Sequence, residues 1–397
     1  MLATAVVLWQ QPWHTDATPT KPFISANAGA VISAQIRGLD NARSETEFVS
    51  AAGDSKASRA WAKEIYANIS LLGATDIELR FVSGGGAGVR ADGATQATVE
   101  VSWRPGSSSG LAERQTKQAE VIFVLNPLKN DTFAIRAAER GSGPLPLWLA
   151  GKLELSRSER VTVISIDGGN ADQPIAGQAD IAHNDVSKVV TTTTVRLVVV
   201  SPHTEQQAAE LLDESTASIA QIAAVTTTLD GSTSAKAVTV VVLNPAVFAT
   251  MDARAAQVVL SHEATHLMTN AATANIETWV AEGFADYVAL HDDKASLSVS
   301  AGQILRSVKK DGAPDQLPTA ADFGSTQHGL GATYESAWMI FRMLGAQFGD
   351  ADILRFYNAV LGGTPTAKAT ESAFGLSVAE ITRDWRAYLV KSASITS

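Results

Sequence analysis

The chain of 397 residues contains no cysteine. This absence excludes disulfide bonds, thiolate metal ligands and thiol catalysis together, so any bound metal must rest on histidine and carboxylate ligands. The sequence also lacks a block of clustered lysine and arginine, and its formal net charge is -10. Because contacts to phosphate need clustered basic side chains, we expect no nucleic-acid partner.

The N-terminus lacks an apolar run long enough to cross a bilayer. Residues 1–9 are mostly apolar, but a spanning helix needs about 20 residues, and the basic flank that begins a signal peptide is missing. Two interpretations stay open, a truncated membrane anchor that has lost an earlier segment and a frayed or artificial terminus. Residues 10–24 are rich in Gln, Pro and Thr, which is typical of a linker. Residues 1–24 are therefore assigned to a linker or truncated anchor.

The composition is that of a globular protein. Hydrophobic residues make up 45% and charged residues 18% of the chain, which argues against wholesale disorder. The length exceeds what one hydrophobic core usually supports, and it predicts two or three domains at about 150 residues each.

A first α+β domain is predicted over residues 25–170. Helical composition is followed by alternating apolar and polar segments between turn residues, which favours helices followed by a curved antiparallel sheet. In outline this weakly resembles the cone-shaped NTF2-like fold, without a defining motif. Its role is open between a ligand pocket, an inhibitory cover, a spacer and a structural appendage. The predicted helices are 26–52 and 56–72, and the predicted strands are 77–81, 98–103, 119–125, 131–136 and 161–166.

A polar connection is predicted over residues 171–192, with His183 at its surface, and a second domain over residues 193–392. This domain begins with a strand, a long helix from Thr204, a second strand and a further helix, an order that places a sheet against the last helix. An open edge of that sheet could hold an extended peptide by strand addition. The remainder is predicted to be helical, with a tail at 393–397. The predicted segments are 193–200, 204–222, 238–243, 252–270, 298–309, 333–348, 350–361 and a last helix from 377.

Two acidic and histidine-rich segments of the second domain form the main functional signal. The first segment reads His262-Glu263-Ala264-Thr265-His266. Residues four apart share one face of a helix, so His262 and His266 can present two imidazoles to a single metal ion. A catalytic zinc takes three protein ligands, and Glu282 on a second helix is the candidate for the third, with Asp286 one turn beyond it. The alternative is a pair of satisfied core histidines.

These residues also carry a family resemblance. The segment 262–266, followed by Trp279-Val280-Ala281-Glu282-Gly283-Phe284-Ala285-Asp286-Tyr287, resembles the gluzincin branch of zinc metallopeptidases, in particular the peptidase MA-like domains of bacteria. The resemblance covers about residues 193–392 and implies a zincin-like fold that cleaves a peptide or protein substrate. The fifteen residues between His266 and Glu282 are fewer than in thermolysin-like relatives, which bears on the shape of the cleft.

The metal chemistry assigns roles to the individual side chains. His262, His266 and Glu282 would hold Zn²⁺ and leave a bound water whose pKa falls to about 7. Glu263 would take the proton of that water and deliver it to the leaving amine. Asp286 would accept the far ring N–H of a ligand histidine and fix its tautomer.

The oxyanion of the reaction needs a hydrogen-bond donor as well. Two candidates follow in the sequence, Tyr334 and His328. The position of Tyr334 resembles that of the oxyanion-stabilising tyrosine in gluzincins, and it is the favoured candidate. His291 lies beside Asp292 and Asp293 and is expected to be solvated rather than a ligand.

Three functional hypotheses follow. The first is an active zinc metallopeptidase, which the resemblance and the N-terminal segment would place outside the cytoplasm or anchored at the cell surface. The second is a zinc-binding or ligand-binding surface module without catalysis. The third is a two-domain interaction protein without a metal. The intact Glu263 counts against the second, and the sequence gives neither the cleavage specificity nor the oligomeric state.

Overall fold

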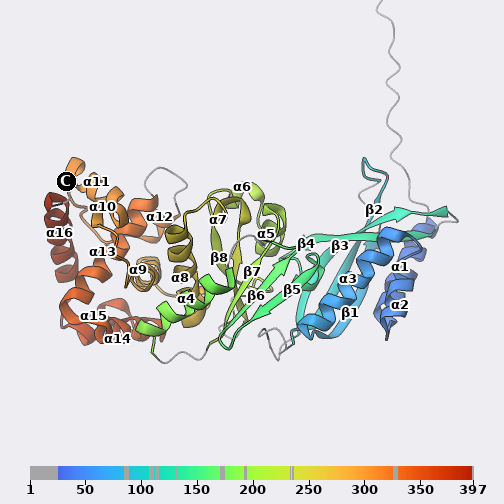
Figure 1. The fold of residues 1–397 in the computed structure, drawn as a ribbon, viewed down its shortest axis with the longest axis horizontal. Coiled ribbons are helices and arrows are strands. Elements are labelled where there is room, and N and C mark those ends of the chain that lie inside the picture. The colour runs from blue at the N-terminus through green and yellow to red at the C-terminus, as the bar shows by residue number, and fades with distance from the viewer. Residues whose placement is uncertain are drawn as a thin grey trace, which may run out of the picture.

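The computed structural model describes residues 26–84, 89–106, 111, 116–129, 132–169, 175–191, 195–232, 234, 237–324 and 330–395. These residues form a mixed structure of helices with one four-stranded and one five-stranded sheet, which confirms the predicted α+β class (Figure 1). The strands are β1 (Thr75–Gly84), β2 (Thr95–Arg104), β3 (Lys117–Pro127), β4 (Phe133–Ser142), β5 (Leu153–Arg157), β6 (Val161–Ile166), β7 (Leu197–Ser201), β8 (Ala224–Thr228) and β9 (Thr239–Leu243). The α-helices are α1 (Ala26–Asn41), α2 (Glu45–Ala51), α3 (Lys56–Leu72), α4 (Ile175–Val189), α5 (Glu205–Leu212), α6 (Thr216–Ile219), α7 (Pro245–Phe248), α8 (Ala253–Thr269), α9 (Thr278–Ala289), α10 (Leu297–Ser300), α11 (Gly302–Asp311), α12 (Ala320–Phe323), α13 (Leu330–Phe348), α14 (Asp350–Leu361), α15 (Thr366–Phe374) and α16 (Val378–Ile395), with short 3-10 helices at Leu147–Leu149 and Ala271–Thr273.

The N-terminal part consists of three helices on an antiparallel sheet in the order β1-β2-β3-β4. Strand β2 alternates as the sequence predicts, with Ala97, Val99, Val101 and Trp103 buried and the residues between them half-buried. This face packs against α1 and α3 in one hydrophobic core. The predicted helix-then-sheet order of this part is confirmed.

The five-stranded sheet has the order β5-β6-β7-β9-β8. Strands β6, β7 and β9 are parallel, whereas β5 and β8 run antiparallel at the two edges. The segment 161–166 was expected in the first sheet, but it pairs with β7 in the second, from Val161 opposite Leu197 to Ser165 opposite Ser201. The predicted domain boundary at residue 170 therefore lies after two strands of the second sheet.

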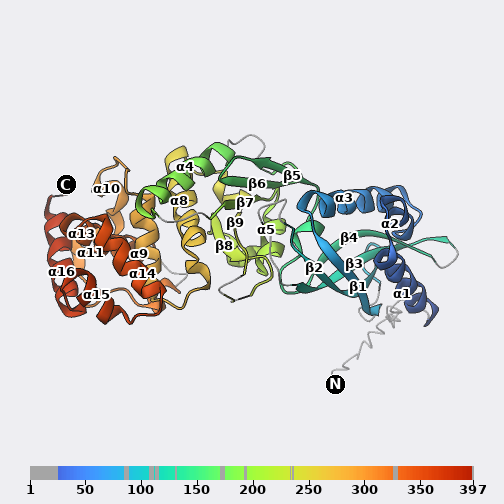
Figure 2. The ribbon, with the colours of Figure 1, turned by 90° about the horizontal axis from the view of Figure 1, so that it is seen from below.

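The second sheet is buried on both faces. In β7, Leu197 and Val199 belong to the core that contains α4 and α8, whereas Val198 and Val200 belong to the core of the N-terminal part. A strand with two buried faces needs apolar residues at every position, which explains the continuous apolar run of this segment. Both ribbon views show the sheet between the N-terminal part and the helices of the C-terminal part (Figures 1 and 2).

The expected connection at 171–192 contains helix α4. Ile175, Ala179, Ala182 and Val186 recur at helical spacing and are buried against α8. The polar residues of this segment lie between the buried ones, on the other faces of the helix. Because they are dispersed among the apolar residues, the helical spacing was not recognised from the sequence. His183 was expected at the surface, but it is buried with 6% exposure.

The long helix predicted from Thr204 to residue 222 is also interrupted. Its first turn has the predicted capping box between Thr204 and Gln207. The helix then ends at Asp213, whose φ of 57° is left-handed, and after the short α6 the chain forms β8. The sheet thus gains an edge strand where the sequence predicted the end of a helix.

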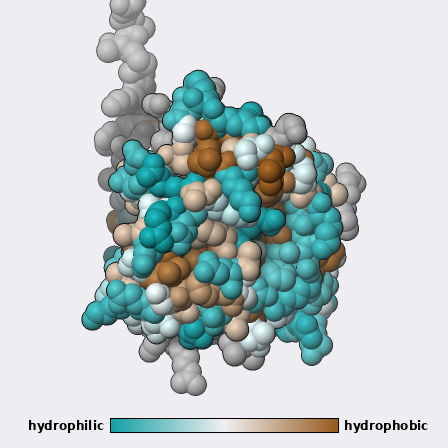
Figure 3. All heavy atoms as spheres, turned by 90° about the vertical axis from the view of Figure 1, so that its left-hand side faces the viewer, coloured by the Kyte–Doolittle hydropathy of each residue, from teal (hydrophilic) through white to brown (hydrophobic). Residues whose placement is uncertain are grey.

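The C-terminal half is helical, as predicted. Helix α16 begins with a capping box in which Ser377 and Glu380 exchange hydrogen bonds of 2.8 and 3.2 Å. Figure 3 shows the outer face of this half, where hydrophobic residues form small groups among hydrophilic ones. None of the helices in the described ranges is long and apolar enough to span a bilayer.

Candidate metal centre

Helix α8 places the two histidines of the motif side by side. It is capped at its start by Asp252, whose Oδ1 accepts from the N–H of Ala255 at 2.8 Å, and it ends at Asn270 in a left-handed conformation with φ 58°. The predicted helix is therefore confirmed. Within it the Nε2 atoms of His262 and His266 are 3.0 Å apart.

Helix α9 brings a carboxylate to the same point. Glu282 Oε2 lies 3.1 Å from His262 Nε2 and 3.5 Å from His266 Nε2. The three side chains are 11 to 18% exposed, so solvent reaches the group only partly. Among the described residues, His262, His266 and Glu282 form a group whose ligand atoms could hold one metal ion.

The position of α9 depends on a close contact with α13. A Cβ on Gly283 would lie 2.7 Å from the carbonyl oxygen of Ala337 and 2.7 Å from Cδ2 of Phe341. Only glycine allows the two helices to approach so closely. The residue next to Glu282 therefore sets how far α9 stands from the helix behind it.

Asp286 determines which nitrogen of His262 faces the other two side chains. Its Oδ1 lies 2.7 Å from His262 Nδ1, and because a carboxylate only accepts, Nδ1 carries the proton. The Nε2 atom of His262 then faces Glu282 Oε2 and His266 Nε2. The three atoms can share a proton or hold a cation between them, and the donor set fits a metal ion.

The electrostatics of the group also favour positive charge. Burial lowers the pKa of His262, but the carboxylates of Asp286 and Glu282 outweigh it and hold that pKa well above its usual range. Burial raises the pKa of Glu282, but hydrogen bonds with His262 and His266 bring it far below the usual range. The carboxylate of Glu282 thus stays ionised and supplies negative charge of the kind that a divalent cation requires.

Glu263, the candidate base, is held by a residue that sequence reasoning missed. Thr226 Oγ1 on strand β8 lies 2.7 Å from Glu263 Oε2 and 2.9 Å from the Glu263 carbonyl oxygen. The run of Thr226, Thr227 and Thr228 is β-branched and could have indicated a strand. Its contact with α8 depends on how the strand packs, which no local pattern shows.

Tyr334, the favoured oxyanion donor, also lies at the group. Its ring centroid is 6.3 Å from that of His262, and the ring of Phe323 lies perpendicular to it with the centroids 5.2 Å apart. Burial and then the nearby carboxylates, Glu282 first among them, raise the pKa of Tyr334, so its hydroxyl keeps its proton and can donate.

The described histidines outside the motif do not join the group. The second donor candidate, His328, falls outside the described residues. His291, which was expected to be solvated, has a 29% exposed side chain, and its Nε2 lies 3.0 Å from Asp350 Oδ2. It belongs to a separate polar contact at the far end of α9.

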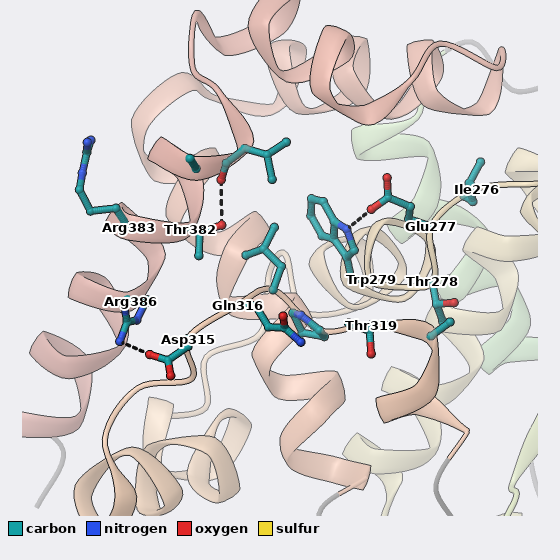
Figure 4. Close-up of a pocket in the computed structure, with 15 residues that line it drawn as sticks. Ile276, Glu277, Thr278, Trp279, Asp315, Gln316, Thr319, Thr382, Arg383 and Arg386 are labelled. Atoms are coloured by element: carbon teal, nitrogen blue, oxygen red, sulfur yellow. Dashed lines mark hydrogen bonds and ion pairs between the residues drawn. The ribbon is translucent and has the colours of Figure 1, made fainter.

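A pocket of about 800 Å³ lies at the start of α9, one turn before Glu282. Trp279 and Leu317 contribute apolar surface, and the middle of α16 contributes Arg386. Figure 4 shows Trp279 turned to Glu277 and Arg386 turned to Asp315, with hydrogen bonds of 2.7 Å in both cases. The pocket is a neighbour of the metal group along α9, but none of the three metal-group residues lines it.

Comparison of the chain with known protein families and with curated proteins gives no match in either case.

Proposed function

We propose that this protein is a zinc-dependent peptidase whose centre is formed by His262, His266 and Glu282, with Glu263 as the general base. The observation that carries the proposal is the convergence of three ligand atoms from two helices beside an acidic residue that takes no part in the group. The Nε2 atoms of both histidines converge on one carboxylate oxygen, Glu282 Oε2, at 3.1 and 3.5 Å. A metal ion shared by the three side chains would account for this convergence.

The side chains around the group support hydrolysis. A bound zinc ion would supply Lewis-acid chemistry and lower the pKa of a water to about 7. Glu263 would accept a proton from the attacking water and later deliver it to the leaving amine. Tyr334 would donate its hydroxyl hydrogen bond to the oxyanion that forms on the peptide carbonyl. Asp286 would keep the ring of His262 in the tautomer that leaves Nε2 as the ligand.

A peptide is the favoured substrate because an open strand edge lies beside the base. Strand β8 pairs on one side with β9 and is the last strand of its sheet in the described part of the chain. An extended peptide can add to such an edge through backbone hydrogen bonds, which tolerate many sequences. This arrangement would bring its carbonyl groups close to Glu263, because Thr226 of β8 touches that residue.

Replacement of the base gives the most direct test. We expect Glu263→Gln to bind zinc as the wild type does and to lose peptide cleavage by at least about 100-fold, the usual contribution of a general base. Cleavage is measured by mass spectrometry on a peptide library, and bound zinc by elemental analysis.

Two outcomes would contradict this proposal. A wild type that holds zinc but cleaves nothing in the library or in a proteome digest would support the alternative, a zinc-binding module without catalysis. A wild type that holds no near-stoichiometric zinc, and whose melting temperature does not rise with added zinc, would remove the metal site altogether.

A further inference from the structure

Thr226 connects the edge strand of the second sheet to the candidate base. Its Oγ1 lies 2.7 Å from Glu263 Oε2, and the Thr226 side chain is part-buried at this contact. We propose that Thr226 is a positioning residue, which orients the carboxylate of Glu263 and couples that orientation to the binding of an extended peptide at β8. The inference rests on the proposed peptidase function. It assigns a role to Thr226, which would act through Glu263 without touching the metal or the reacting atoms.

The register of the sheet fixes the direction of the Thr226 side chain. Thr226 lies opposite Val241, and Ala224 lies opposite Leu243, and these three apolar neighbours belong to the core that contains α8. Side chains two residues apart lie on one face of a strand, so Thr226 also faces α8. Because threonine is branched at Cβ and has few χ1 rotamers, its hydroxyl is held in a narrow range of positions.

The backbone N–H and C=O of Thr226 lie in the plane of the sheet and point away from β9, towards the edge of the sheet. Asn244 N donates to Ala223 O at 2.8 Å, and Leu229 N donates to Val238 O at 3.2 Å. In an antiparallel ladder the residues that exchange these bonds alternate along the strand. The odd-numbered residues of β8 therefore face β9, and the N–H and C=O of Thr226 point outward.

One residue thus offers two kinds of contact. Its backbone N–H and C=O are the groups that an added peptide strand would pair with, and its hydroxyl donates to the base. Pairing with a peptide would fix the backbone of Thr226 and, through its stiff side chain, the carboxylate of Glu263. The base would then be oriented best when a substrate occupies the edge.

The matched variants Thr226→Val and Thr227→Val test this inference. Valine keeps the shape of threonine and removes the hydroxyl. Thr227 lies on the other face of the same strand, so its replacement controls for the loss of a hydroxyl from β8. We expect Thr226→Val to lower kcat on the order of 10- to 100-fold with little change in KM, since a small misplacement of a catalytic group has effects of this size. Thr227→Val should keep the wild-type kcat.

Conservative replacement and metal content distinguish positioning from structural support. Thr226→Ser keeps the hydroxyl but not the branched Cβ, so it should recover part of the lost kcat, while both variants bind zinc as the wild type does. The inference would be overturned by equal kcat for Thr226→Val and Thr227→Val, or by equal losses for Thr226→Val and Thr226→Ser. A Thr226→Val protein that unfolds or loses zinc, when Thr227→Val does not, would overturn it too, because the hydroxyl would then be a structural bond. Absence of cleavage by the wild type would instead contradict the proposed function itself.

Discussion

Two carboxylates close to the candidate metal site differ in whether they reach the histidines. Glu282 and Glu277 are both carboxylates near the start of α9, but only Glu282 reaches the two histidines. The carboxylate of Glu277 accepts instead from Trp279 Nε1 at 2.7 Å. The pair therefore offers the proposed metal ligand and a matched control at the start of one helix.

We expect Glu282→Ala to lower zinc affinity by more than about 100-fold. Loss of an outer hydrogen-bond partner alone costs about 10- to 100-fold, and loss of a direct ligand should cost more. Zinc binding is measured by competition with a chelator of known affinity. Glu277→Ala should retain zinc, and equal retention by both variants would show that the third ligand lies elsewhere.

Helices α9 and α13 illustrate how an element positions the centre. Their contact at Gly283 brings the helix that carries Glu282 against the helix that carries Tyr334. A side chain at this point would have to displace a backbone carbonyl, which cannot rotate away as a flexible side chain can. The spacing of the two helices is therefore sensitive to a single methyl group.

We expect Gly283→Ala to destabilise the protein by about 1–3 kcal/mol, the usual cost of overpacking. Gly177→Ala in α4 is the matched control, because its Cβ would meet nothing within 4 Å and alanine is the better helix former. Urea unfolding curves of the two variants give the difference. Equal stability would mean that α9 and α13 separate at little cost.

The elements that carry the metal group could be predicted because each has its own local signal. Helix α8 has a cap at Asp252, a left-handed end at Asn270, and polar residues on an otherwise apolar surface. Strands β5 and β8 and helix α4 were missed. In β5 only Leu153 is buried, so the strand has little apolar pattern, and the apolar positions of α4 are dispersed among polar ones. The assignment of β6 to the wrong sheet has another cause, since strand pairing depends on distant partners.

Prediction of the candidate metal site from the sequence was likewise limited to contacts that follow from local spacing. The positions of His262, His266, Glu282 and Asp286 follow from spacing along two helices. Thr226 could not be found in this way, because its contact with Glu263 depends on the register of β8 against β9 and on the packing of α8.

In the whole molecule, an ion pair connects the N-terminal part to the hairpin of β8 and β9, and β8 is the strand that contacts Glu263. Lys117 of β3 and Asp230, in the turn between β8 and β9, form an ion pair of 2.8 Å with side chains only 3 and 14% exposed. A pair this well buried is weak evidence for added stability, but removal of one partner leaves the other charge poorly solvated.

We expect Lys117→Met to lower the free energy of unfolding by about 3–5 kcal/mol, the range found when a buried ion pair is broken. Lys152→Met, which removes the exposed partner of Glu154, should change it little. Chemical denaturation of both variants measures the difference between their free energies of unfolding. A small effect at Lys117 as well would show that this ion pair contributes little to joining the two parts of the protein.

The burial of the second sheet on both faces also has a consequence for the synthesis of the chain. The core of the N-terminal part includes Val198, Val200, Val240 and Val242, which are translated long after helices α1 to α3 and the first sheet. Until β9 has left the ribosome, the earlier segments cannot complete their core and expose apolar surface to the cell. The nascent N-terminal part should therefore be a client of ribosome-associated chaperones, even though the finished protein buries all of this surface.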